Sequence, residues 1–344
     1  MRPRFYPALV NDRFGDPVVY VDLLTERRAM LFDLGDIGGL TARQLLRVSD
    51  VFVSHTHIDH FIGFDRLLRV LVGRAKHLRL YGPRAFIDHV EAKLAAYTWN
   101  LTDRFPDDLI FSVLELHGDG GGRRAGFRLK NGFAREDEAT VRIDGGIILD
   151  EPSLAVRAVE LAHRTPCLAF ALAESEHVNV WKNRLAELGL EVGPWLGALK
   201  RAVFAKRPDD TPITVQRRGG ATDTMRLGFL RTAVLSITPG QKVAYVTDAA
   251  CTPDNAEAIV DLARGADILF IESMFAAADA AIAADRAHLT TAEAGALARR
   301  AGVARLEPFH FSPRYAAEPD RLLREAEAAF RAPTAGPNMT VAPP

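Results

Sequence analysis

Three histidines and an aspartate lie within six residues of this chain, in the segment Ser54-His55-Thr56-His57-Ile58-Asp59-His60. The apolar residues 50–53 predict a buried strand before the segment, and residues 64–71 have helical spacing after it. The cluster is therefore predicted to lie on a strand-to-helix turn. Imidazole and carboxylate groups are ligands for divalent cations such as Zn²⁺, and crowded together they would repel one another or stay unpaired without a cation. A single histidine would indicate little, but this spacing predicts a metal site.

A single turn cannot close a metal site, so further ligands are expected at the ends of other strands. His163, Asp248 and His310 each follow a predicted strand. With the cluster at 55–60 they make seven nitrogen and oxygen donors, too many for one tetrahedral zinc. They suit two cations with one bridging carboxylate, and metals about 3.5–4 Å apart can share a hydroxide and clamp the oxygens of a phosphodiester. The other histidines have no such position and are expected to be surface or structural residues: His77, His89, His117 and His177.

Composition limits the remaining function classes. The 344 residues are 48% apolar and 25% charged, with a formal net charge of -1, so no global attraction to nucleic acid or anionic membrane is expected. Only two cysteines occur, which excludes a cysteine-based structural zinc site and argues against a disulfide framework. We find no run long enough to span a bilayer and no signal-peptide pattern, so a cytoplasmic protein without membrane contact is expected.

The pattern of strands and helices indicates one α/β domain over residues 1–344 with an inserted arm at 176–228. Residues 108–172 look β-rich, with a glycine-rich loop at 118–126. Within the arm we predict a helix near 180–188 followed by irregular chain. Eight Lys and Arg residues stand against five Asp and Glu residues between positions 176 and 218. Such an excess of positive charge suits either a solvated face or a local surface for a polyanion. Strands and helices alternate again over residues 242–331.

Several segments resemble known proteins. Ser54 to His60 looks like the signature of the metallo-β-lactamase fold. Residues 286–295 (Arg-Ala-His-Leu-Thr-Thr-Ala-Glu-Ala-Gly) and 309–315 (Phe-His-Phe-Ser-Pro-Arg-Tyr) resemble ribonuclease Z, the endonuclease family that trims the 3′ ends of tRNA precursors. Residues 32–36 and 43–47 are similar to the N-terminal part of that family, and residues 193–200 resemble part of its tRNA-gripping arm. The matching segments are spread over most of residues 18–330.

The resemblance implies an αββα sandwich, with two mixed β-sheets flanked by helices. It implies that His55, His57 and His163 hold one metal, that Asp59, His60 and His310 hold the other, and that Asp248 bridges them. Asp59 would help to deprotonate the bridging water, while Glu272 and His288 would deliver a proton to the leaving 3′-oxygen, a task that a carboxylate-paired imidazolium suits. Ser312 and Arg314 match positions near the scissile phosphate. The cofactors would be two divalent ions, Zn²⁺ first and Mn²⁺ or Fe²⁺ as alternatives. The partner would be a tRNA precursor. The family is often dimeric, which leaves a homodimer open, but the sequence does not fix the oligomeric state.

Three positions depart from the family pattern. Residues 10–15 replace its Gly-Thr-Gly turn, Ile271 stands where a histidine precedes the glutamate, and Ala249 replaces a threonine. Two alternatives to a tRNA-processing endoribonuclease therefore stay open. One is a phosphodiesterase for small or cyclic-nucleotide substrates on the same metal core. The other is a metal-binding or RNA-binding protein without catalysis.

Overall fold

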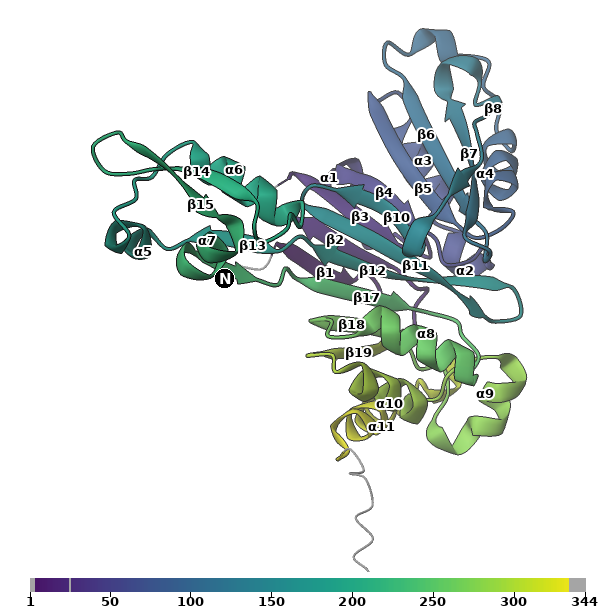
Figure 1. The fold of residues 1–344 in the computed structure, drawn as a ribbon. Coiled ribbons are helices and arrows are strands. Elements are labelled where there is room, and N and C mark those ends of the chain that lie inside the picture. Colours follow the sequence, from purple (N-terminus) through teal and green to yellow (C-terminus); the bar gives the residue numbers. More distant parts are fainter. Residues whose placement is uncertain (1–3, 25, 334–344) are drawn as a thin grey trace, which may run out of the picture. The chain divides into compact units, whose positions relative to one another are not determined.

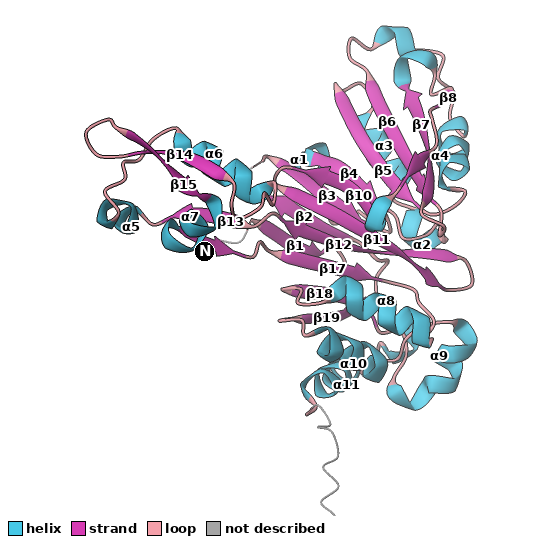
Figure 2. Cartoon of the chain, in the orientation of Figure 1, coloured by secondary structure: helices cyan, strands magenta, loops and turns pink. Residues whose placement is uncertain are grey.

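The computed structural model describes residues 4–24 and 26–333, and its contacts divide the chain into two units, residues 1–173 with 241–344 and residues 174–240. Within the described residues, the first unit contains a nine-stranded sheet and a six-stranded sheet (Figures 1 and 2). The first sheet has the order β1-β2-β3-β4-β5-β6-β7-β8, with β9 beside β7, and the second has the order β10-β11-β12-β17-β18-β19. Among these residues, no helix combines the length and apolarity that a bilayer crossing requires.

The strands of the first sheet are β1 (Phe5–Leu9), β2 (Val19–Leu23), β3 (Arg28–Phe32), β4 (Val48–Phe52), β5 (Lys76–Gly82), β6 (Leu109–Leu116), β7 (Gly121–Arg128), β8 (Arg135–Asp137) and β9 (Val141–Arg142). Those of the second are β10 (Ile147–Glu151), β11 (Leu154–Ala162), β12 (Pro166–Glu174), β17 (Lys242–Val246), β18 (Ile268–Glu272) and β19 (Leu306–Phe309). The helices of this unit are α1 (Ala42–Arg47), α2 (Ile58–Phe61), α3 (Phe64–Leu71), α4 (Phe86–Ala95), α8 (Pro253–Ala263), α9 (Ala280–Arg286), α10 (Thr291–Ala301) and α11 (Pro319–Arg331).

Alternating side chains on the strands build three layers of core. On β17, Val243 and Tyr245 pack between the two sheets, whereas Ala244 and Val246 pack toward α8 and α10. On β4, Phe52 belongs to the inter-sheet core and Val51 to the core beneath α1, α3 and α4. This alternation is what a strand buried on both faces requires. The order of layers is therefore helices, sheet, sheet, helices.

Three of the four strands that lead to predicted ligands, β4, β17 and β19, have a parallel neighbour, whereas β11, which leads to His163, pairs antiparallel with β10. β3, β4, β5 and β6 pair in parallel, and so do β17, β18 and β19. Carboxyl ends of parallel strands meet at one edge of a sheet, so the residues that follow β4, β17, β18 and β19 can converge. The backbone also joins the sheets there, since Leu168 N donates to Ser54 O over 2.8 Å.

The glycine-rich segment 118–126 is not a loop throughout, because β7 begins at Gly121 and pairs antiparallel with β6. A Cβ at Gly122 would lie 2.9 Å from the carbonyl oxygen of Glu115, so the close approach of the strands requires a glycine there. The sheet environment overrides the low strand propensity of glycine.

The second unit, residues 174–240, contains the range 176–228 that the sequence assigns to an arm. Its elements are β13 (His177–Val180), α5 (Lys182–Glu187), α6 (Trp195–Phe204), β14 (Pro212–Gln216), β15 (Thr222–Arg226), α7 (Leu227–Val234) and β16 (Leu235–Thr238). The prediction of irregular chain after the first helix is wrong. Trp195, Leu199 and Val203 form a buried helical stripe, and with Ile213 and Val215 of the β14–β15 hairpin they give this unit its own core.

Candidate active site

The ligand turn follows β4 and leads into α2. Its close packing against the loop after β3 depends on a glycine, because a Cβ at Gly35 would lie 2.4 Å from the carbonyl oxygen of Asp59. On the other side, Thr56 Oγ1 is hydrogen-bonded to His89 Nδ1 of α4 over 2.8 Å. The turn is thus held between two neighbouring elements, as a rigid ligand loop requires.

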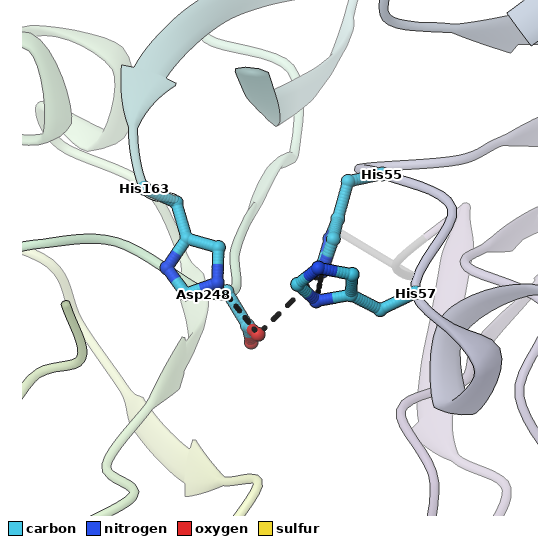
Figure 3. A group of neighbouring side chains, drawn as sticks. All are labelled: His55, His57, His163 and Asp248. Atoms are coloured by element: carbon cyan, nitrogen blue, oxygen red, sulfur yellow. Dashed lines mark hydrogen bonds and ion pairs between the residues drawn. The ribbon is translucent and has the colours of Figure 1, made fainter. Parts of the chain in front are cut away.

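Four side chains form a first cluster around one carboxylate oxygen. Figure 3 shows His55 and His57 of the ligand turn facing His163 and Asp248. Asp248 Oδ2 lies 3.6 Å from His55 Nε2 and 3.7 Å from His163 Nε2. His57 Nδ1 lies 2.8 Å from His55 Nε2. A single cation between these atoms would have three imidazole ligands and one carboxylate ligand.

A second cluster uses the other oxygen of the same carboxylate. Asp248 Oδ1 lies 3.6 Å from His60 Nε2 and 2.9 Å from His310 Nδ1. Asp59 Oδ2 lies 3.5 Å from His60 Nε2 and 3.3 Å from His310 Nε2. The two oxygens of Asp248 therefore face one cluster each, which is the arrangement of a carboxylate that bridges two ions.

The electrostatics of the clusters fit cations. His60 Nε2 is buried and makes no hydrogen bond, although Asp59 and Asp248 lie close to it. Burial would lower the pKa of His310, but the charge and hydrogen bond of Asp248 together with the hydrogen bond to Asp59 outweigh burial and raise the pKa to about 9. By contrast, burial and the neighbouring His60 lower the pKa of His55 to about 2. A divalent ion between these groups would neutralise the two carboxylates and would take the imidazoles as neutral ligands.

Asp33 supports this site, and sequence reasoning missed its role. It is fully buried, has a φ of 59°, and follows β3 directly. Its carboxylate accepts hydrogen bonds from the backbone N of Ser54 (2.6 Å), from Tyr245 Oη (2.7 Å) and from His60 Nδ1 (2.8 Å). These bonds fix the ring of His60 so that Nε2 points to the clusters. An acidic residue at the end of an apolar strand was the available signal.

Glu272 and His288 lie together beside the second cluster. His288 Nδ1 lies 3.0 Å from Glu272 Oε2. Burial would lower the pKa of His288, but the charge and hydrogen bond of Glu272 together with the charge of Asp248 outweigh burial, so the pKa is raised. The other oxygen, Glu272 Oε1, accepts from the backbone N of Ala249 (2.7 Å) and of Leu289 (3.3 Å). One carboxylate thus orders both the imidazole and the loop after Asp248.

Two of the three positions that depart from the family pattern, Ile271 and Ala249, place their side chains in the core and not in the clusters. Ile271 is fully buried in the core between the second sheet and its helices, so it does not face the clusters. Ala249 contributes its backbone N–H to Glu272, and its methyl group packs into the same core. The N-terminal segment contacts the chain directly after His310, since Phe311 N donates to Arg13 O over 2.8 Å.

A cavity of about 470 Å³ opens onto the clusters and is lined by His57, Asp59, His163, Arg164, Asp248, Met274, Asp285, Arg286, His288 and His310. Ser312 and Arg314, which the sequence placed near the phosphate, are not among these residues. Arg314 lies over the ring of Phe275, 5.3 Å from its centroid. The cavity instead has two cations that sequence reasoning did not single out, Arg164 and Arg286.

The four remaining histidines lie outside the clusters and bond to other partners. His77 Nε2 bonds to Ser112 Oγ over 2.7 Å, and His117 Nε2 to Glu115 Oε1 over 2.8 Å. His177 lies 3.0 Å from Glu174. With His89 of α4, which bonds to Thr56 of the ligand turn, they have the structural positions that the sequence predicted.

Comparison with known proteins gives consistent matches. The family model of the beta-lactamase superfamily domain matches residues 208–311. A ribonuclease Z from Deinococcus radiodurans is 32% identical over 311 residues, covering 88% of this chain and 88% of the relative. A ribonuclease Z from Rippkaea orientalis is 30% identical over 86% of this chain and 82% of the relative.

Solved structures agree on the fold. The short form of human tRNase Z matches with a TM-score of 0.50 at 18% identity, over 91% of this chain and 92% of that one. The metallo-beta-lactamase fold protein YhfI from Bacillus subtilis matches with a TM-score of 0.53 at 15% identity, over 94% of both chains. These matches confirm the metallo-β-lactamase fold expected from the sequence.

Proposed function

The chain belongs to the ribonuclease Z family, and we propose that it is a metal-dependent endoribonuclease that cuts the 3′ extension from tRNA precursors. The observation that carries this proposal is the division of Asp248 between two clusters beside the Glu272–His288 pair. Metal-dependent hydrolysis of a phosphodiester needs a site for cations and a proton donor for the leaving oxygen, and both lie in one cavity.

Family membership implies divalent metal binding, and we propose two ions, Zn²⁺ first. His55, His57 and His163 would hold one ion, Asp59, His60 and His310 the other, and Asp248 both. When bound, such ions lower the pKa of a water ligand and neutralise phosphate charge. The side chain of Asp59 is 38% exposed, more than that of Asp248, the other carboxylate among the seven ligands. Asp59 can therefore accept a proton from water in the cavity.

His288 is the proposed general acid. Its raised pKa favours the protonated ring, and Glu272 orients the ring through Nδ1, which leaves Nε2 for the leaving 3′-oxygen. Ser312 and Arg314 remain proposed phosphate contacts, which they could make to parts of the RNA outside the cavity. A homodimer remains a proposal that rests on the family alone.

The second unit supports an RNA substrate. Lys182, Arg201, Lys206 and Arg207 are exposed and make no ion pair with any described residue. Trp181 and Phe204 are 40% and 50% exposed on the same unit. Exposed cations bind phosphates and exposed rings stack on bases, so we propose that this unit grips the tRNA.

The test is cleavage of a precursor tRNA with a 3′ extension by purified protein reconstituted with Zn²⁺ or Mn²⁺. We expect a single cut, lost on chelation and lowered by roughly 10³-fold or more in Asp59→Asn, the range seen when essential catalytic groups are removed. Arg324→Ala, an exposed change on α11, serves as the control. An intact precursor together with rapid hydrolysis of bis-p-nitrophenyl phosphate would instead identify a small-molecule phosphodiesterase. Retained cleavage by Asp59→Asn would contradict the role of Asp59.

A further inference from the structure

Two arginines line the catalytic cavity without serving the clusters. Arg164 follows the proposed ligand His163, and Arg286 is the last residue of α9. Both are exposed, and the only other charged residue of the lining that is neither a cluster member nor a histidine is Asp285. Positive charge thus prevails on this side of the cavity.

Arg164 lies against the turn of chain that carries Arg286. An Nη2 group of Arg164 donates to the backbone carbonyl of Asp285, which holds Arg164 against the end of α9. The side chain of Arg286 makes no hydrogen bond or ion pair with any residue that the structure describes. A guanidinium group that is exposed, unpaired and directed to a catalytic cavity is free to bind an anion.

The same turn carries the proposed general acid. Ala287, at a φ of 59°, ends α9, and its carbonyl accepts a hydrogen bond from His163 Nδ1 over 2.8 Å. His288 follows directly. The arginines therefore lie on the side of the cavity where the leaving oxygen departs.

We propose that Arg286, with Arg164 beside it, binds the RNA phosphate one nucleotide upstream of the cut. This inference rests on the proposed function, because the 3′-oxygen that leaves belongs to the mature tRNA side. The next phosphate on that side is the one attached to the 5′-oxygen of the same nucleotide. The pair would fix the last nucleotide of the mature tRNA beside His288 and so help to define which bond is cut.

Arg164 has a structural role as well, because it caps the carbonyl end of α9, where a cation is favourable. Arg286 has no such contact within the described chain, so it gives the cleaner test. Arg286→Ala removes an exposed side chain at a helix end and is expected to fold normally. Arg286→Lys keeps the charge but loses the paired N–H groups.

The first measurement is steady-state cleavage of a precursor tRNA by the full-length, metal-loaded enzyme. We expect Arg286→Ala to raise KM about tenfold, as loss of a charged hydrogen bond does, with a smaller change in kcat. Arg286→Lys should recover part of the loss. The slope of log KM against log salt should fall by about 1, the value for one phosphate contact. Arg324→Ala should match the wild type in both respects.

The second measurement replaces the upstream phosphate with a neutral methylphosphonate. The wild type should bind the modified RNA about tenfold more weakly than the unmodified RNA. Arg286→Ala should bind the two RNAs nearly equally, because the arginine that contacts this phosphate is already absent. Equal penalties in both proteins, or an unchanged KM in Arg286→Ala while the wild type cuts RNA, would overturn this phosphate site alone. A wild type that leaves the RNA intact would overturn the proposed function and this site together.

Discussion

Two buried carboxylates act on the site through imidazole rings. Glu272 is bonded to His288 and to two backbone N–H groups, and Asp33 is bonded to His60, Ser54 and Tyr245. Both are fully buried, so each hydrogen bond lies in surroundings where an unpaired donor is costly. Single-atom changes at these residues should therefore have separable effects on protonation, metal binding and stability.

Glu272→Gln should shift the pH dependence of activity. Oε1 can still accept from Ala249 and Leu289, so the fold is kept, but the negative charge beside His288 is gone. That charge raises the pKa of His288, so its loss lowers the pKa. A general acid is lost as pH rises through its pKa, and the alkaline limb of the kcat profile should therefore move to lower pH, with kcat reduced about 10²-fold at neutral pH. An unmoved alkaline limb would show that another group donates the proton.

Asp33→Asn should weaken metal binding. In the wild type, His60 Nδ1 and Tyr245 Oη donate to the carboxylate of Asp33. In the variant, the NH₂ group of the amide faces these donors and cannot accept from them. We expect metal affinity to fall about 10–100-fold, the usual effect of a lost outer hydrogen bond to a ligand. Competition with a chromogenic chelator measures this, and Asp36→Asn on the same loop, where the side chain is exposed, is the control. Equal affinities in the two variants would remove Asp33 from the metal site.

At the scale of elements, helix packing depends on where a glycine lies. Gly295 is in the middle of α10, where glycine is unfavourable by about 1 kcal/mol relative to alanine. A Cβ there would lie 2.3 Å from the carbonyl oxygen of Ala326 on α11. Gly197 of α6 has no such neighbour, since its Cβ would meet only Arg201 Nη1 at 3.5 Å. Close approach of α10 and α11 thus explains the first glycine but not the second.

Alanine at these two positions should have opposite effects on stability. Gly295→Ala should destabilise the protein by about 1–3 kcal/mol, because backbone must move to admit the methyl group. Gly197→Ala should stabilise α6 by about 0.5–1 kcal/mol through helix propensity. Urea unfolding followed by circular dichroism compares them. Two shifts of the same sign would contradict this account of α10 packing.

At the scale of the whole molecule, the chemistry and the RNA-binding surface are proposed to lie in different units. All seven proposed ligands and the Glu272–His288 pair are in residues 1–173 and 241–344, whereas the exposed cations and rings described above are in residues 174–240. Ala173 and Lys242 are register partners on β12 and β17, so the second unit is inserted at the end of an ordinary strand pair.

Removal of the second unit should separate phosphodiester hydrolysis from tRNA binding. Replacing residues 174–240 with a short turn should keep hydrolysis of bis-p-nitrophenyl phosphate, because β12 and β17 stay paired. Cleavage of precursor tRNA should lose at least about tenfold in kcat/KM at physiological salt, since phosphate contacts are lost. The triple variant R201Q/K206Q/R207Q should show a smaller loss of the same kind. Full tRNA cleavage by the shortened protein would contradict a gripping role for this unit.

Sequence alone determined a good part of this protein. The spacing of His55, His57, Asp59 and His60 on a strand-to-helix turn is a local property. The strand ends before His163, Asp248 and His310 were recognisable for the same reason. Each signal depends on neighbours within a few residues, where chain geometry is nearly independent of the fold.

Only the tertiary structure decided how these parts meet. It divides the oxygens of Asp248 between two clusters, gives Asp33 its place behind His60, and directs Ile271 into the core. It also brings Arg164 and Arg286 into the cavity, and makes a hairpin and two helices of a segment that looked irregular. Most of these features depend on contacts between residues far apart in the sequence, as the 251-residue separation of Asp59 and His310 illustrates. Such contacts form only when two sheets pack, and no local pattern of residues encodes them.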